Sequence, residues 1–275
     1  MYPGLDEIVV GLTQAAYSVN PIENAEKSYK LIKKYYREAD IVVLPEYSML
    51  NPLEVKDPAR VYELSEYLAN SRYLSYFFKL ASEIDAYILL HFIERTDKPP
   101  LTKSTSVIVT SKGEAFPVYN KMHLFDAYGY RESDYFEPGR GPGKLTSISG
   151  VEVAFAICYD IRFPELFRVY AHMGAKVIIL QSGWVKGPLK EEILDKLASV
   201  RAHENGVYLV VVNQTGGMFT GRSGVFNPWG YKELDLGFEE KYIEYTLNLE
   251  NVVKARETVP VIRQASEKWE VKLKS

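Results

Sequence analysis

Short apolar runs alternate with helical patterns along most of this chain of 275 residues. The runs at residues 8–12, 41–44 and 87–92 are rich in aliphatic side chains, and segments with helical spacing separate them. Strands that alternate with helices are the order that builds a sheet covered by helices. The alternation therefore predicts an α/β fold.

The first helix has a well-marked start. Asn20 can cap it, Pro21 suits its first turn, and Glu23 stands three residues after the cap, as in a capping box. A second helical region is expected over residues 57–84, broken near Asn70. The side chains of the first helix that should face the sheet are Ile22, Ala25, Tyr29, Ile32 and Tyr36.

Residues 104–110 and 115–119 predict two strands joined by a turn at Lys112 and Gly113. Strands of a hairpin are antiparallel, so the sheet is mixed. The chain contains no internal repeat, low-complexity tract or linker, so we expect residues 1–275 to form one domain. Further strands are expected at 151–157, 177–180 and 207–212 and near Ser223 and Tyr242, with helices at 165–172 and 189–204.

A long polar segment, residues 123–145, carries several glycines and has neither helical nor strand periodicity. Loops of this length in compact domains are usually functional or disordered, and we interpret this one as an active-site loop. Gly141, Gly143 and Lys144 superficially resemble a phosphate-binding loop. That motif needs Ser or Thr directly after the lysine, but Leu145 stands there, so the resemblance is rejected.

Charge and cysteine content exclude several classes of function. The net charge is −3 and the basic side chains form no stripe, so the chain has no basic surface suited to binding nucleic acid. The apolar stretch at 8–19 is too short to span a bilayer and follows acidic residues, so neither a signal peptide nor a membrane helix is expected. The cytoplasm is the default compartment. Cys158 is the only cysteine, which excludes an internal disulfide and a cysteine-built metal site within one chain.

Cys158 follows the apolar run 151–157 and precedes a polar turn that leads into a helix. A strand-to-helix turn presents a side chain at the sheet edge and directs backbone N–H groups toward a bound group, as nucleophiles and oxyanion holes require. The alternative is a buried structural thiol, because free cysteine is among the most buried residue types. Position alone leaves both interpretations open.

Glu46 and Lys121 also follow predicted strands. Chemistry in open α/β sheets gathers outside the carboxyl ends of strands. A carboxylate there can take a thiol proton and return one to a leaving amine, and an ammonium can lower a thiol pKa and bind a developing oxyanion. A solvated surface role is the alternative for each residue alone. Thiol, carboxylate and ammonium at three strand ends together favour a shared site.

The segments around these three residues resemble the motifs of the nitrilase superfamily, also called carbon–nitrogen hydrolases. Residues 44–46 resemble its glutamate motif, 120–126 its lysine motif and 158–165 its cysteine motif. The omega-amidase-like branch is the subgroup most similar, because an Asp-x-Arg-Phe run and a Glu-Ser pair after the lysine are typical of it. The resemblance extends over nearly the whole chain, to Gln14, Glu132, Ser133 and the segments 136–139, 201–213 and 221–230.

The resemblance implies a four-layer αββα sandwich with mixed sheets, usually dimerised through helices, without a metal or organic cofactor. It also implies hydrolysis of a non-peptide carbon–nitrogen bond in a small-molecule substrate. Glu46 would deprotonate Cys158, whose thiolate would attack an amide carbonyl. Lys121 and the backbone N–H of Tyr159 would hold the oxyanion. Glu132 would orient Lys121 or the substrate.

Arg162 stands four residues after Cys158 on the same expected turn, and its planar fork can bind a carboxylate in bidentate fashion. Together with the omega-amidase-like resemblance, this predicts a substrate with a carboxylate beyond the scissile amide, such as a dicarboxylic acid monoamide. The alternative is a structural ion pair of Arg162 with Asp160 or Glu165.

Three other hypotheses stay open. The same triad can hydrolyse nitriles or N-carbamoyl compounds, and motifs do not separate these from amides. A second hypothesis is a non-catalytic scaffold that binds a partner, although all three triad positions are filled. A third pairs His123 with Cys158, as in thiol proteases. The histidines have no metal-ligand spacing and are expected to be structural: His91, His123, His172 and His203.

Overall fold

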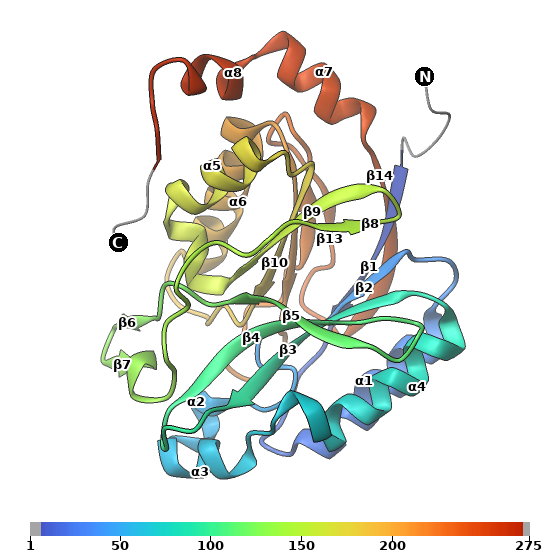
Figure 1. Ribbon diagram of the computed structural model, residues 1–275, viewed down its shortest axis with the longest axis vertical. Coiled ribbons are helices and arrows are strands. Elements are labelled where there is room, and N and C mark those ends of the chain that lie inside the picture. The colour runs from blue at the N-terminus through green and yellow to red at the C-terminus, as the bar shows by residue number, and fades with distance from the viewer. Residues whose placement is uncertain (1–6, 272–275) are drawn as a thin grey trace.

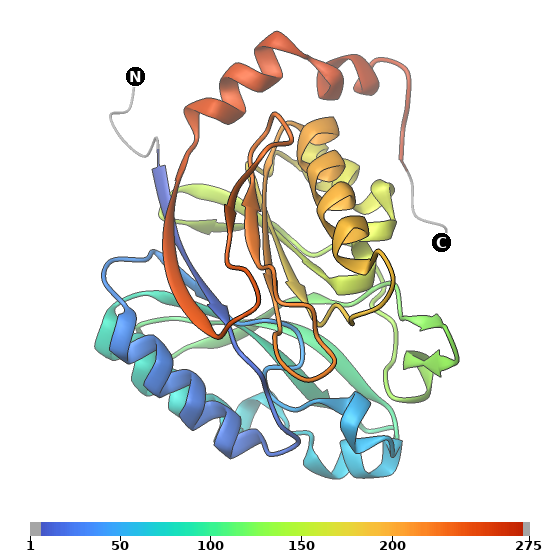
Figure 2. The same cartoon turned by 180° about the vertical axis from the view of Figure 1, so that it is seen from behind.

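The structure, a computed structural model, describes residues 7–271. Two six-stranded sheets stack face to face, and helices cover the outer face of each sheet (Figure 1). The same four layers are visible from behind in Figure 2. The predicted αββα sandwich with mixed sheets is confirmed. Within residues 7–271, no helix has the length and apolar character needed to cross a membrane.

The first sheet contains three central parallel strands with antiparallel neighbours on both sides. Its parallel strands bring their carboxyl ends to one edge of the sheet. In order across the sheet, the strands are β14 (Lys241–Asn248), β1 (Glu7–Gln14), β2 (Ile41–Val43), β3 (Tyr87–Arg95), β4 (Thr102–Val109) and β5 (Ala115–Asn120).

The second sheet repeats this plan, with three parallel strands flanked by antiparallel ones. In order, its strands are β13 (Lys232–Asp235), β12 (Gly224–Phe226), β11 (Tyr208–Asn213), β10 (Val177–Ser182), β9 (Val151–Ile157) and β8 (Thr146–Ile148). A separate two-stranded ribbon is formed by β6 (Asp126–Ala127) and β7 (Tyr130–Arg131).

The helices form the two outer layers. α1 (Pro21–Tyr35) and α4 (Arg72–Ile84) cover the first sheet, and α5 (Pro164–Met173) and α6 (Lys190–Asn205) cover the second (Figure 1). After β14 the chain continues into α7 (Glu250–Thr258) and α8 (Val261–Ser266), and α8 packs near α5 and α6. The shorter helices are α2 (Pro52–Val55), α3 (Pro58–Leu64), η1 (Leu68–Asn70), η2 (Glu132–Asp134) and η3 (Cys158–Arg162).

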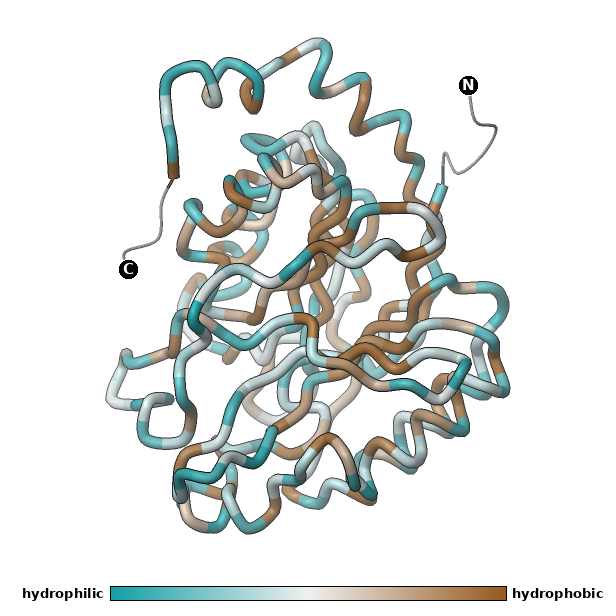
Figure 3. The backbone as a smooth tube through the Cα atoms, viewed as in Figure 1, coloured by the Kyte–Doolittle hydropathy of each residue, from teal (hydrophilic) through white to brown (hydrophobic). Residues whose placement is uncertain are grey.

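The hydrophobic core follows from the strand sequences. β10 and β11 are buried along their whole length, as expected for parallel strands that are covered on both faces. Side chains such as Val10 and Leu12 of β1 meet the second sheet, whereas Ile32 of α1 and Phe77 of α4 pack on the outer face of the first. Figure 3 shows the hydrophobic segments concentrated in the strands of the two inner layers.

The sequence predictions for helices are partly corrected. Asn20 caps α1 as predicted, with its Oδ1 accepting from the Ile22 N–H at 3.1 Å. The Glu23 carboxylate, however, accepts from the Asn20 side chain at 2.9 Å, and not from the backbone of the cap. Of the predicted sheet-facing stripe, only Ala25 and Ile32 are fully buried. The helical region over 57–84 is interrupted near Asn70 as predicted, because η1 lies between α3 and α4.

Other elements were missed because they have no apolar run or periodicity. The predicted polar loop 123–145 contains β6, β7 and η2. Two closing strands were predicted near Ser223 and Tyr242, but β13 lies between them and has the polar sequence KELD. The helices α2, α7 and α8 were also not predicted. These errors lie at the periphery and leave the predicted layers intact.

Candidate active site

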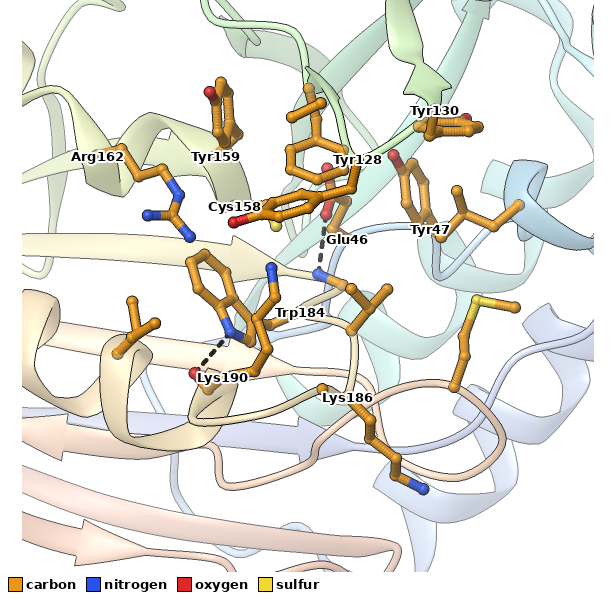
Figure 4. A pocket seen from close by; sticks show the side chains of 18 of the residues that line it. Glu46, Tyr47, Tyr128, Tyr130, Cys158, Tyr159, Arg162, Trp184, Lys186 and Lys190 are labelled. Atoms are coloured by element: carbon orange, nitrogen blue, oxygen red, sulfur yellow. Dashed lines mark hydrogen bonds between the residues drawn. The ribbon is translucent and has the colours of Figure 1, made fainter.

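Glu46, Lys121 and Cys158 come together at one edge of the two sheets. Lys121 directly follows β5 and Cys158 directly follows β9, while Glu46 comes three residues after β2 ends. The Lys121 Nζ lies 2.7 Å from the Glu46 Oε1. The Cys158 side chain lines the same pocket as this carboxylate. The geometry therefore brings the three predicted residues together from both sheets, and Figure 4 shows Glu46 and Cys158 in this pocket.

The Glu46 carboxylate is fixed by two donors and is almost completely buried, with 1% of the residue exposed. Its Oε1 accepts from Lys121, and its Oε2 accepts from the Gly183 N–H at 2.8 Å. Its backbone carbonyl accepts from the Gln214 side chain at 2.8 Å. Burial raises the pKa of Glu46, which outweighs the lowering by the Lys121 charge. The raised pKa makes the Glu46 carboxylate a stronger base than an exposed glutamate.

Lys121 lies between two carboxylates. Its Nζ is 2.7 Å from Glu46 and 2.8 Å from the Oε1 of Glu132, and all three side chains are buried. Burial lowers the pKa of Lys121, but Glu132 and Glu46 together raise it well above its usual value. The ammonium therefore keeps its charge. Glu132 is held in turn by the Tyr47 hydroxyl at 2.8 Å and the Phe125 N–H at 2.6 Å. Its predicted role in orienting Lys121 is compatible with these contacts and stays a prediction.

Cys158 begins the 3₁₀ turn η3 and has a φ of 43°, in the left-handed region that residues other than glycine rarely adopt. Strain of this kind persists only where the surrounding structure imposes it, and it is concentrated at functional sites. The Ser182 hydroxyl lies 3.5 Å from the Cys158 sulfur and donates to it. Burial raises the pKa of the Cys158 thiol. The thiol is therefore protonated at neutral pH and needs a base to become a nucleophile.

Asp160 holds this turn against the end of β5. Its Oδ1 accepts from the His123 N–H at 3.1 Å and lies 2.7 Å from the His123 Nδ1. Its Oδ2 accepts from the Tyr119 hydroxyl at 2.8 Å and from the Ile157 N–H at 2.9 Å. The strand that ends in Lys121 is thus tied to the turn that carries Cys158. Sequence reasoning missed this role.

Two of the alternatives raised from the sequence are wrong. His123 binds Asp160 and stacks on Phe163 with ring centroids 3.6 Å apart, so it does not form a pair with Cys158. Arg162 forms no ion pair with Asp160 or Glu165. Its guanidinium instead lies 4.9 Å from the Trp184 ring and lines the same pocket as Cys158.

Glu46, Lys121 and Cys158 line a pocket of about 680 Å³, and Tyr159 and Arg162 line the same pocket. A substrate-binding role for Tyr159 and Arg162 stays a prediction. The β6–β7 ribbon supplies further wall residues, which fits the interpretation of 123–145 as an active-site loop. The aromatic residues of the wall are Tyr47, Phe125, Tyr128, Tyr130, Tyr159 and Trp184.

Aromatic wall residues other than Tyr159 escaped the sequence predictions, because they come from distant segments that share no local pattern. Tyr47 alone could have been found, since it directly follows Glu46. The Tyr130 hydroxyl is buried and has no hydrogen-bond partner among residues 7–271. No cluster of three or more His, Cys, Asp or Glu side chains suited to a metal ion occurs within residues 7–271.

Most of this chain matches the sequence model of a known protein family. The model of the carbon–nitrogen hydrolase family matches residues 9–257. This chain belongs to that family. The predicted superfamily, its omega-amidase-like branch and the enzyme class, an amidase-type carbon–nitrogen hydrolase, are confirmed.

Individual relatives of this carbon–nitrogen hydrolase align over most of its length. The 2-oxoglutaramate amidase of Bacillus subtilis (strain 168) is 30% identical over 246 residues, which cover 88% of this chain and 90% of the relative. The omega-amidase NIT2-B of Xenopus laevis is 27% identical over 273 residues, with coverage of 92% and 94%. Shorter alignments with four other relatives cover between 58% and 83% of those proteins.

The fold is also that of solved family members. The crystal structure of a carbon–nitrogen hydrolase from Helicobacter pylori G27 superimposes with a TM-score of 0.84, and 94% of each chain is covered. The two sequences are 23% identical, so this likeness concerns the fold alone.

Proposed function

We propose that this enzyme hydrolyses a small amide through a thioester intermediate on Cys158. The observation that supports this most strongly is that a thiol lines the same pocket as the buried Glu46–Lys121–Glu132 cluster. The thiol can act as nucleophile, Glu46 as base and Lys121 as oxyanion partner, while Glu132 holds the ammonium.

In the first half of the reaction, Glu46 takes the proton of the Cys158 thiol as its sulfur attacks the amide carbonyl carbon. The carbonyl oxygen becomes negative and is stabilised by the Lys121 ammonium and the Tyr159 backbone N–H. Glu46 then gives its proton to the leaving nitrogen, the carbon–nitrogen bond breaks, and ammonia departs. The acyl group remains on sulfur as a thioester.

The second half repeats these roles with water as the nucleophile. Glu46 takes a proton from water, the oxygen attacks the thioester carbonyl, and the same two donors hold the oxyanion. The carbon–sulfur bond breaks, the carboxylic acid leaves, and the proton returns to Cys158. Glu132 keeps Lys121 in place throughout, because it also binds the ammonium.

The names of the relatives support a particular class of amide. One relative is a 2-oxoglutaramate amidase and another an omega-amidase. Together with Arg162 in the pocket wall, these names support an amide that bears a carboxylate beyond the scissile bond, such as a dicarboxylic acid monoamide.

Ammonia release from a panel of amides, nitriles, ureido acids and dicarboxylic acid monoamides tests this function. We expect amides to be hydrolysed and the Cys158→Ala variant to retain less than about one hundredth of the wild-type rate, since the thiol is the nucleophile. Ammonia release from nitriles alone, or from ureido acids alone, would contradict amide hydrolysis. It would indicate nitrile hydrolysis or N-carbamoyl hydrolysis instead. Ammonia release above about one hundredth in Cys158→Ala would contradict the covalent mechanism.

Two controls separate chemistry from folding and from a scaffold role. The melting temperature of Cys158→Ala should match that of the wild type, because alanine removes one sulfur atom and adds no bulk. A small alkylating agent at neutral pH should modify the wild type once and leave Cys158→Ala unmodified, because this is the only cysteine. An unreactive wild-type thiol and no turnover on the panel would favour a non-catalytic scaffold.

A further inference from the structure

Two cations flank one aromatic side chain in the wall of the pocket. The guanidinium of Arg162 lies 4.9 Å from the Trp184 ring centroid, and the Lys190 Nζ lies 5.7 Å from the same centroid. The Lys190 Nζ also lies 4.2 Å from the Tyr128 ring. The Trp184 Nε1 donates to the Lys190 backbone carbonyl at 2.9 Å, which fixes the indole between the two cations (Figure 4).

These two cations have no anionic partner within residues 7–271. Neither Arg162 nor Lys190 forms a salt bridge there, although ion pairs are common elsewhere on the surface. Like charges near one ring repel each other, and a partly buried position weakens the screening by solvent. A bound anion would remove this repulsion and accept hydrogen bonds from both groups.

Lys186 lines the same pocket but differs in its contacts. Its Nζ donates to the Gly217 carbonyl at 2.8 Å, and its side chain extends away from Trp184 (Figure 4). Besides Lys121, the pocket thus contains one lysine, Lys190, that contacts the aromatic wall and one, Lys186, that is bound elsewhere. The two lysines form a natural pair of test and control positions.

The remaining wall is apolar and the pocket is large. Leu53, Phe125, Val185, Ile193 and Met218 contribute hydrocarbon or aromatic surface. The volume of about 680 Å³ lies in the range of sites that enclose drug-sized ligands. A short dicarboxylic acid monoamide fills a small part of this space and offers little apolar surface to bury. The walls therefore match a bulkier acyl group.

We infer that the preferred substrate is a primary amide whose acyl body is apolar, such as an arylalkyl group, and which ends in a carboxylate bound by Lys190 and Arg162. This inference rests on the proposed amide hydrolysis. The amide end lies at Cys158, the apolar body contacts the aromatic wall, and the carboxylate lies beside Trp184. Lys190 is then a specificity-determining residue that does not touch the reacting atoms.

Four primary amides that combine two bodies with two end groups test this inference. They are butyramide, succinamate, phenylpropionamide and the para-carboxy derivative of phenylpropionamide. We expect kcat/KM to be highest for the carboxylated aryl amide. The Lys190→Met variant should lower kcat/KM for that amide by roughly ten- to a hundredfold and change the value for phenylpropionamide by less than about threefold. Arg162→Met should show the same selectivity.

The Lys186→Met variant is the matched control and should leave kcat/KM for both aryl amides within about threefold of the wild type. Equal losses on the acid and the neutral amide in Lys190→Met, or a preference of the wild type for succinamate over the carboxylated aryl amide, would overturn the inference.

Binding separates this inference from the proposed reaction. Calorimetry with the Cys158→Ala enzyme should show tighter binding of the carboxylated aryl amide than of phenylpropionamide, and Lys190→Met in that background should remove the difference. Binding of this kind without turnover by the wild type would contradict amide hydrolysis and support the anion site. Turnover by the wild type without the binding difference would overturn the anion site alone.

Discussion

Lys121 carries its charge between two carboxylates, and the protonation of the neighbouring thiol follows from this arrangement. Glu46 and Glu132 both contact the ammonium, so the cluster has an excess of negative charge beside Cys158. Burial and the Glu46 charge raise the pKa of Cys158, which outweighs the lowering by Lys121. The resting protein therefore holds a thiol, and in the proposed mechanism the thiolate forms only as Glu46 takes the proton during attack.

We expect kcat/KM for a small amide to fall as the pH is lowered, because protonation of Glu46 removes the base. Burial raises the pKa of Glu46 above its ordinary value of 4.5, so the loss begins at a higher pH than for an exposed glutamate. A pH profile of kcat/KM measures this, with circular dichroism at each pH to show that the fold persists. An acidic midpoint at or below 4.5 would contradict the assignment.

Substitution of the same residue provides the control for this profile. Glu46→Gln should lower turnover by at least about a hundredfold, and its residual activity should lack the acidic limb. Lys121→Ala should be nearly as damaging, because residues that act as one unit are not additive. Glu83→Gln, an exposed glutamate on α4, should retain both rate and profile. Normal turnover in Glu46→Gln would show that the base has been assigned wrongly.

The turn η3 and the end of β5 behave as one unit because Asp160 binds both. The carboxylate is completely buried and accepts from Tyr119, His123 and the Ile157 N–H. It therefore fixes the strained start of the turn, where Cys158 has a φ of 43°. Lys121 lies between Tyr119 and His123 in the sequence, so the position of the ammonium depends on the same contacts.

Asp160→Ala should lower the free energy of unfolding by about 2–5 kcal/mol, because it leaves several buried donors without an acceptor. It should also lower kcat, since both Lys121 and Cys158 lose their support. Denaturant unfolding and steady-state kinetics measure the two effects. Asp134→Ala, at an exposed position paired with Arg131 at 3.4 Å, should change stability by less than about 0.5 kcal/mol. Equal effects of the two variants would rule out this role for Asp160.

Elements with strong local signals were predictable from the sequence, and elements held by distant contacts were not. α1 begins where Asn20 and Pro21 predict, because capping depends only on neighbouring residues. β13 carries a polar sequence and forms only because β12 pairs with it. The location of Glu46, Lys121 and Cys158 at one edge was predictable in the same local sense, because each residue follows a strand. The contacts of Trp184 with Arg162 and Lys190 have no such signal.

Buried glutamines connect the two sheets of the whole molecule. Gln181 of β10 accepts from the Ser106 hydroxyl of β4 and donates to the Leu44 carbonyl, both at 2.6 Å. Gln14 of β1 accepts from the Ser223 N–H at 2.8 Å. Because the core between the sheets is otherwise largely hydrophobic and non-directional, these bonds fix how one sheet sits on the other. The alignment of the sheets in turn sets the distance between residues of the site.

Gln181→Leu tests this connection, because leucine keeps a similar volume and removes every hydrogen bond of the side chain. The Ser106 hydroxyl and the Leu44 carbonyl would stay buried without partners, so we expect the free energy of unfolding to fall by about 2–4 kcal/mol. Leu44 lies two residues before Glu46, so kcat should fall as the carboxylate loses its alignment with Cys158. Gln264→Leu, at an exposed position on α8, should affect neither quantity. A Gln181→Leu enzyme as stable and active as Gln264→Leu would show that hydrophobic packing alone aligns the sheets.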